Sequence, residues 1–171
     1  MRWFLLSTVL ALVGACGFAQ PPPVAMQTPF LEADHRAYLE PGTSAIRGQG
    51  FLRQQGGGVV TCAGEMVMIV PATGFFWEMV HHIQQGHEPN LVTAVAPAST
   101  PALVRLFHQS QCDAQGNFAF DALAPGKWVV LTQVKWKVGY GMQGGNLLRQ
   151  ILLPAGTTLQ VLLSDGDFGG R

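Results

Sequence analysis

Residues 113–128, DAQGNFAFDALAPGKW, contain a turn followed by a strand. Asp113 and Gly116 occupy the first and fourth positions of a type I turn, in which the last residue favours glycine. Phe118 and Phe120 lie two residues apart, so their side chains point to the same face of a strand. We expect both rings to fill the core, and we interpret Asp113 as a turn residue rather than a metal ligand or an acid.

A second turn and a longer strand come next. Residues 124–127, APGK, have proline second and glycine third, which is the pattern of a type II turn. Residues 128–138 then alternate between apolar and polar side chains, as a strand does when only one face is buried. Trp128 and Trp136 fall on the apolar face, and we expect both to be core residues because aromatic side chains bury large areas.

The composition agrees with a single all-β domain. The chain has 171 residues, of which 48% are hydrophobic and 12% are charged, with 21 glycines and 11 prolines. These values favour short strands and turns over long helices, and they exclude a disordered tail. Ten Lys and Arg balance ten Asp and Glu, with no basic cluster. We therefore expect no nucleic-acid partner.

The remaining elements follow from the periodicity of apolar residues. Short helices are predicted at residues 31–39 and 75–83, and a glycine-rich hairpin loop at 139–145. The other predicted strands are residues 44–55, 59–62, 66–70, 91–96, 103–107, 147–153 and 159–163. The sequence thus predicts a single antiparallel β-sandwich of about seven to nine strands with a short inserted helix, preceded by a signal peptide.

The N-terminus has the pattern of an export signal. Arg2 supplies a positive charge, and the uncharged run 3–13 is too short to span a bilayer but fits the apolar part of a signal peptide. Residues 13–16, VGAC, resemble the lipobox of bacterial lipoproteins. This resemblance implies cleavage before Cys16, acylation of its sulfur and attachment to the membrane. The following Gly17 implies the outer membrane, facing the periplasm.

A second processing site stays open. Residues 17–19, GFA, form a small-x-small site, and cleavage after Ala19 would give a soluble periplasmic or secreted protein. On the lipoprotein reading, the chain divides into a signal peptide (1–15), an anchor with a Pro-rich linker and short helix (16–43), the sandwich (44–165) and a tail (166–171).

The exported chain keeps Cys62 and Cys112 if Cys16 is acylated or removed. Thiols oxidise in the periplasm, so a disulfide between the two is the natural hypothesis. The alternative is two separate buried thiols, because free cysteine is often buried.

The motif D-x-x-G-x-F-x-F-x-x-L-x-x-G-x-W at 113–128 resembles the carboxypeptidase regulatory-like domain, a transthyretin-like (prealbumin-like) β-sandwich. Residues 48–52, 62–64 and 67–73 resemble the first strands of that unit. The resemblance covers about residues 44–164, and it implies a non-catalytic accessory or stand-alone module. The segment 75–86 is an insertion relative to the family.

One cluster of side chains could bind a metal. On a helix, Glu78 lies three residues before His81 and four before His82, and His87 follows. Such a set could ligate zinc or copper. The alternative is the polar face of a surface helix, and no H-E-x-x-H spacing is present, so we expect no cofactor.

No nucleophile elbow or phosphate-binding loop is present, and we expect no enzymatic activity. The sequence predicts a non-catalytic cell-envelope lipoprotein that acts as a binding or structural module, with another envelope protein or a glycan as partner. Tyr140 and Met142, in the predicted loop 139–145, are the expected contact residues, because loops carry function on rigid scaffolds. The alternatives are a plain connector for this loop and a periplasmic metal-binding role for the whole protein.

Overall fold

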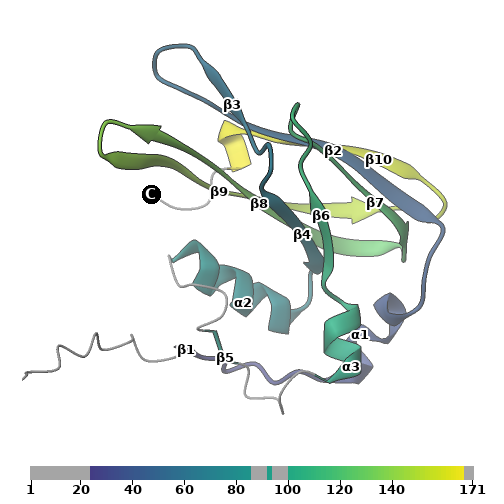
Figure 1. The fold of residues 1–171 in the computed structure, drawn as a ribbon. Coiled ribbons are helices and arrows are strands. Elements are labelled where there is room, and N and C mark those ends of the chain that lie inside the picture. The colour runs from purple at the N-terminus through teal and green to yellow at the C-terminus, as the bar shows by residue number, and fades with distance from the viewer. Residues whose placement is uncertain (1–23, 86–91, 94–99, 168–171) are drawn as a thin grey trace, which may run out of the picture.

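Two four-stranded sheets pack face to face in a computed structural model of the chain (Figure 1). The structure describes residues 24–85, 92–93 and 100–167. The first sheet contains β2 (Ser44–Arg53), β3 (Val59–Thr61), β7 (Asn117–Leu123) and β10 (Thr158–Leu163). The second contains β4 (Met66–Pro71), β6 (His108–Gln111), β8 (Gly126–Val138) and β9 (Gly141–Leu153). The predicted all-β sandwich is confirmed.

The first sheet is built around β2. β7 pairs antiparallel with the first half of β2, and β3 pairs antiparallel with its last three residues. β10 pairs with β2 in parallel, from Thr158 opposite Ala45 to Leu163 opposite Gly50. This pair departs from the purely antiparallel arrangement that the sequence predicts. The reason is that the chain leaves β9 in the second sheet and enters the first sheet beside the beginning of β2.

The second sheet has the order β6–β4–β8–β9, and α2 (Gly74–Gln84) lies across its outer face (Figure 1). Trp128, Val129 and Val130 of β8 are all fully buried, although they are consecutive. Trp128 and Val130 belong to the core between the sheets, whereas Val129 packs with Phe76 of α2. Simple alternation therefore fails at the start of β8 because the helix covers the face that the pattern assigns to solvent.

Of the four aromatic side chains predicted to lie in the core, three are buried there. Phe118, Phe120 and Trp128 are at most 6% exposed, whereas Trp136 is only partly buried against the same core. The turn at Asp113 also forms as predicted. Its carboxylate accepts hydrogen bonds from the backbone N–H groups of residues 115 and 117 at 2.9 and 2.8 Å.

The predicted helices at residues 31–39 and 75–83 form as α1 (Glu32–Leu39) and α2. The predicted strand at 103–107 is wrong, because α3 (Pro101–Arg105) occupies most of it. The Thr100 side chain accepts a hydrogen bond from the backbone of Leu103 at 3.2 Å, and Pro101 follows it, so the start signals of a helix outweigh the apolar run.

Smaller elements complete the fold. The predicted strand at 91–96 is described only as β5 (Val92–Thr93), which pairs in parallel with β1 (Val24–Ala25). A 3₁₀-helix, η2 (Asp165–Asp167), follows β10. Met26 and His35 are 1% exposed, so packing begins well before residue 44. Among the described residues, no helix has the length and apolarity needed to cross a membrane.

The predicted loop at 139–145 is mostly strand. Val138 of β8 pairs with Gly141 of β9, which leaves a two-residue turn of Gly139 and Tyr140. Gly139 has φ 59° and stands first in the turn, as a type II′ turn requires, and this turn matches the twist of the two strands. The glycine-rich residues 141–145, which the sequence assigns to a loop, are therefore part of a paired strand.

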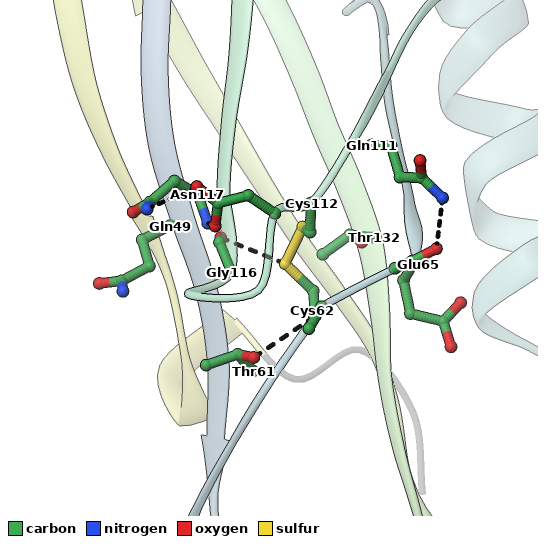
Figure 2. Close-up of a disulfide and its surroundings, with 12 residues drawn as sticks. Gln49, Thr61, Cys62, Glu65, Gln111, Cys112, Gly116, Asn117 and Thr132 are labelled. Atoms are coloured by element: carbon green, nitrogen blue, oxygen red, sulfur yellow. Dashed lines mark hydrogen bonds between the residues drawn. A yellow bond between two sulfur atoms is a disulfide. The ribbon is translucent and has the colours of Figure 1, made fainter.

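A disulfide between Cys62 and Cys112 joins the two sheets, with their Cα atoms 5.7 Å apart (Figure 2). Cys62 directly follows β3 of the first sheet, and Cys112 directly follows β6 of the second. Beside the bridge, the Gln111 side chain donates to the backbone carbonyl of Gly64 at 2.9 Å. The disulfide hypothesis is confirmed, and separate thiols are excluded.

Replacing both cysteines, Cys62→Ala with Cys112→Ala, is expected to lower the free energy of unfolding by about 4 kcal/mol, because the bridge closes a loop of about 50 residues in the unfolded chain. Urea unfolding at neutral pH measures the loss. A loss below about 1 kcal/mol would contradict a stabilising role for the bridge.

Gly48 lies opposite Phe118 in the first sheet, and a Cβ on it would lie 2.2 Å from the tip of that ring. Gly48→Ala is therefore expected to cost about 1–3 kcal/mol of unfolding free energy through overpacking. Gly56→Ala is the control, because a Cβ there meets nothing within 4 Å. If the two variants were equally stable in urea, the packing of the Phe118 ring would not require glycine at position 48.

Candidate functional site

A cleft of about 740 Å³ lies between the end of β2 and the outer part of the β8–β9 hairpin. It is bounded by one aromatic ring, several side-chain amides and one ion pair. The residues that line it are Leu52, Arg53, Gln54, Gln55, Trp136, Gln143, Gly144 and Asp165. These residues come from three separate regions of the sequence, which the sandwich brings to one end.

Trp136 is placed by the register of the hairpin. It pairs with Gln143, so both side chains lie on the same face of the ribbon. Gly144 has φ 100°, and a Cβ there would lie 2.0 Å from the carbonyl oxygen of Val134 and 3.0 Å from the Trp136 ring. Only glycine fits at this position, and its missing side chain leaves room for the indole.

Arg53 and Asp165 form a polar wall of the cleft. The Asp165 carboxylate accepts from the backbone N–H of Arg53 at 3.0 Å and from its guanidinium at 3.1 Å. The guanidinium also lies 5.4 Å from the centre of the Phe51 ring. Asp167, in the same 3₁₀ turn as Asp165, accepts from Arg149 of β9 at 2.6 Å, so the turn is tied to the hairpin strand.

This combination of groups suits a polyhydroxylated ligand. A flat indole can pack against the C–H face of a sugar ring, while amides offer both donors and acceptors to hydroxyl groups. The guanidinium adds donors and the carboxylate adds acceptors. Pockets of this size with a few convergent polar groups are typical of small-ligand sites.

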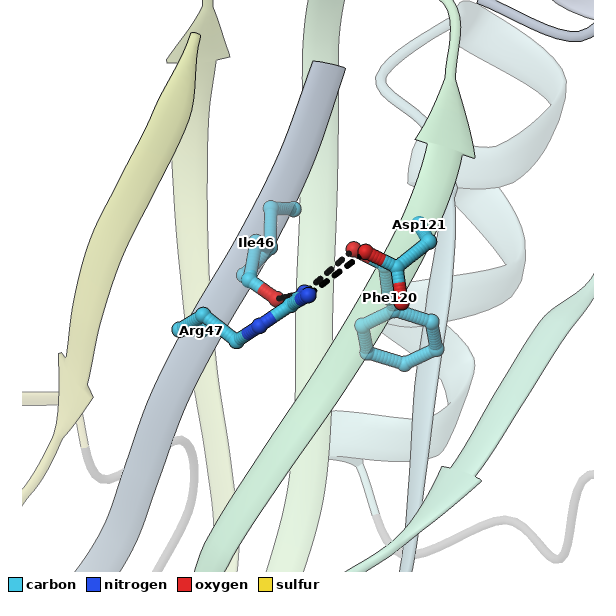
Figure 3. A network of polar contacts seen from close by, with 4 residues as sticks. All are labelled: Ile46, Arg47, Phe120 and Asp121. Carbon is cyan, nitrogen blue, oxygen red and sulfur yellow. Dashed lines mark hydrogen bonds and ion pairs between the residues drawn. The ribbon is translucent and has the colours of Figure 1, made fainter. Parts of the chain in front are cut away.

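A second hollow, of about 680 Å³, is lined mainly by residues of β2, β6, β7 and β10. Arg47 donates to Asp121 beside it at 2.6 Å and to the carbonyls of Ile46 and Phe120 at 3.0 and 3.2 Å (Figure 3). These bonds link β2 to β7, which is a structural role. The aromatic ring in its lining, Phe118, is buried in the core, so this hollow offers no exposed platform.

The predicted metal ligands are only partly brought together. Glu78 uses both carboxylate oxygens to accept from the backbone N–H groups of Gln27 and Thr28, at 2.5 and 2.7 Å. His82 lies 3.8 Å from that carboxylate, whereas a ring nitrogen of His81 lies 2.9 Å from the Gln85 side chain. Within the described ranges, no group of three or more His, Cys, Asp and Glu side chains could hold a metal.

His87 and Cys16 lie outside the described residues, so the metal and acylation predictions are untested there. The predicted contact residues are strongly exposed, with Tyr140 at 108% and Met142 at 65%, but neither lines the cleft. The sequence reading placed Trp136 in the core and did not single out Arg53 or Asp165. Trp136 does contact the core. Its exposure to the cleft depends on how β8 pairs with β9, and the spacing of residues within one strand does not predict that pairing.

Glu78 is expected to make stability depend on acid. Hydrogen bonds from the backbone of Gln27 and from the side chain and backbone of Thr28 hold its pKa below the ordinary value of 4.5. A carboxyl whose pKa is lowered by folding stabilises the fold above its unfolded pKa, and this contribution is lost as pH falls through the folded pKa. The Glu78→Gln variant should therefore be less stable than the parent at pH 7. When the pH is lowered, its stability should fall by less than that of the parent.

Urea unfolding at pH 7 and at about pH 3 measures this difference, with Glu32→Gln, at an exposed position of α1, as control. Identical acid sensitivity of the parent and Glu78→Gln would contradict the role given to this carboxylate.

The structure defines a class, a β-sandwich with a helix on one face. No family model matches the chain. No curated protein matches it either. Membership of the carboxypeptidase regulatory-like family therefore stays a prediction.

Among solved structures, the chain is similar to a crystal structure from Pseudomonas aeruginosa described as a "putative carbohydrate binding protein". The TM-score is 0.62 at 19% identity, over 79% of this chain and 97% of that one. A chlorocatechol 1,2-dioxygenase from Pseudomonas putida aligns with a TM-score of 0.29 at 14% identity, over 86% of this chain and 69% of that one. The first likeness is one of fold, and the second carries no argument.

Proposed function

We propose that this domain is a non-catalytic carbohydrate-binding module of the bacterial cell envelope, with its ligand in the cleft beside Trp136. The observation that carries the proposal is a half-buried indole at the wall of a cleft of about 740 Å³, next to side-chain amides and the Arg53–Asp165 pair. Apolar and polar contacts thus meet at one place, as a sugar requires.

The site is organised before any ligand arrives. Trp136 is held by core packing on one side and by the space at Gly144 on the other. Asp165 holds Arg53 through two hydrogen bonds. For Trp136, binding then costs little side-chain entropy, because a group that is already ordered need not be fixed again.

Two further observations support the proposal, one for the envelope and one for the glycan. Disulfides persist in oxidising compartments, and the Cys62–Cys112 bridge agrees with the export signal of the sequence. The fold neighbour from Pseudomonas aeruginosa is described in terms of carbohydrate binding, which agrees with a glycan partner. On this proposal, acylation of Cys16 attaches the module to the outer membrane.

The proposal includes binding without cleavage. Glycoside hydrolysis usually employs two carboxyl groups on either side of the scissile bond. Asp165 is the one carboxylate among the described residues that line the cleft, and Arg53 neutralises it. A bound oligosaccharide is therefore expected to be released intact.

A panel of neutral and acidic oligosaccharides, followed by titration of the best binder, tests this function. Trp136→Ala is expected to weaken binding at least tenfold, since buried aromatic anchors typically dominate binding energy. Tyr140→Ala is the matched control, because Tyr140 is exposed on the same hairpin but does not line the cleft.

Two results would overturn the proposal. Equal binding by Trp136→Ala and the parent would place the ligand elsewhere on the molecule. Release of shortened oligosaccharides by the purified parent, but not by Asp165→Asn, would show catalysis at the cleft.

A further inference from the structure

The end of the β8–β9 hairpin extends beyond the rest of its sheet. β4 pairs with β8 only from Trp128 to Leu131, whereas β9 pairs with β8 as far as Val138. From Thr132 onward, the described part of β8 therefore has β9 as its one strand partner. Figure 1 shows this ribbon as a projecting arm of the sandwich.

The tip of this arm carries apolar side chains that face solvent. Val138 is 48% exposed, Tyr140 is 108% exposed and Met142 is 65% exposed. They lie within five consecutive residues on either side of the tight turn at Gly139. Val138 lies on the same face of the ribbon as Trp136, whereas Met142 pairs with Lys137 and lies on the other face. With Tyr140 in the turn, the apolar side chains surround the end of the ribbon.

The charge on the arm has one sign. Lys135 and Lys137 are exposed, and residues 122–164, which include all of β8 and β9, contain no Asp or Glu. The acidic side chains described near the base of the arm are Asp165 and Asp167, each paired with an arginine, and Glu65, which accepts a hydrogen bond from Gln133 of β8 at 2.6 Å. The outer part of the arm is therefore positive as well as apolar.

We propose that the tip of the β8–β9 hairpin docks on an anionic lipid surface. Tyrosine suits the level of the headgroups, and lysines can lie along apolar surface while their ammonium groups reach phosphates. Apolar contact and attraction to anionic lipids add together in such shallow binding.

The size of the patch favours lipid over protein. A stable protein interface buries about 800 Å² on each partner and is built around a packed centre. Three side chains on a two-stranded arm are too few for that, whereas a bilayer needs no complementary surface and accepts a narrow tip. The docking does not depend on the sugar cleft, whose lining includes none of the three tip residues.

Vesicle sedimentation tests the proposal with the chain from Gln20 onward, exported behind an ordinary signal peptide, so that it carries neither an acyl group nor the apolar run 3–13. The probes are vesicles of phosphatidylcholine alone and of phosphatidylcholine with about 30% phosphatidylglycerol. The parent is expected to bind the anionic vesicles and to bind the neutral ones at least tenfold more weakly.

Two variants then separate the contributions. Tyr140→Ser with Met142→Ser is expected to weaken binding to anionic vesicles at least tenfold through lost apolar contact. Lys135→Gln with Lys137→Gln should weaken it roughly 25-fold, because each charge near an anionic surface contributes about fivefold. The control, Leu152→Ser with Leu162→Ser, removes leucines that are 65% and 46% exposed elsewhere and should leave binding unchanged.

The proposal is overturned if the parent does not bind anionic vesicles, or if the tip variant binds them as well as the leucine control. Thermal unfolding of each variant confirms that a loss of binding is not a loss of fold. Oligosaccharide binding by the tip variant is expected to be unchanged, so failure here leaves the proposed function standing.

Discussion

The backbone ladder that holds β8 between β4 and β9 is the interaction on which the rest of the structure depends. At its inner end, β8 places Trp128 in the core between the sheets and Val129 under α2, so one strand joins both apolar clusters. At its outer end, the same strand leaves β4 behind and carries Trp136 to the cleft. The two ends differ because β8 and β9 each have 13 residues, whereas β4 has six. Core, cleft and projecting arm are therefore successive parts of a single strand.

Much of the fold follows from local interactions that can be recognised in the sequence. The turn at Asp113, the paired phenylalanines and the helix at residues 75–83 form as predicted because each depends on neighbours close in the chain. Two of the predictions that failed show the physical reasons. Residues 103–107 are apolar enough for a strand, but Thr100 and Pro101 start a helix before them. Val129 was expected to face solvent, but α2 folds back over the sheet and buries it. The periodicity within the strand does not predict this contact.

The candidate site was less accessible to sequence reasoning than the fold. Arg53 and Asp165 are 112 positions apart, and the hydrogen bonds between them exist only because β10 returns beside β2. Trp136 was assigned to the core by its place in an alternating strand, which is half correct, since one side of the ring contacts the core. For Glu78, the sequence predicted a functional role that the structure does not support. Its spacing to two histidines suggested a set of metal ligands. In the structure, its oxygens bind the backbone of residues 27 and 28 instead.

The disulfide also determines what happens to this chain when a protease cuts it. In the sequence, Cys62 and Cys112 enclose β4, α2, β5, α3 and β6. A single cut anywhere between the two cysteines leaves both fragments covalently joined, so the nicked molecule keeps its mass apart from one added water. The damage becomes visible only when the bridge is reduced. In an oxidising compartment, cleavage in this region would thus leave the two sheets still linked to each other.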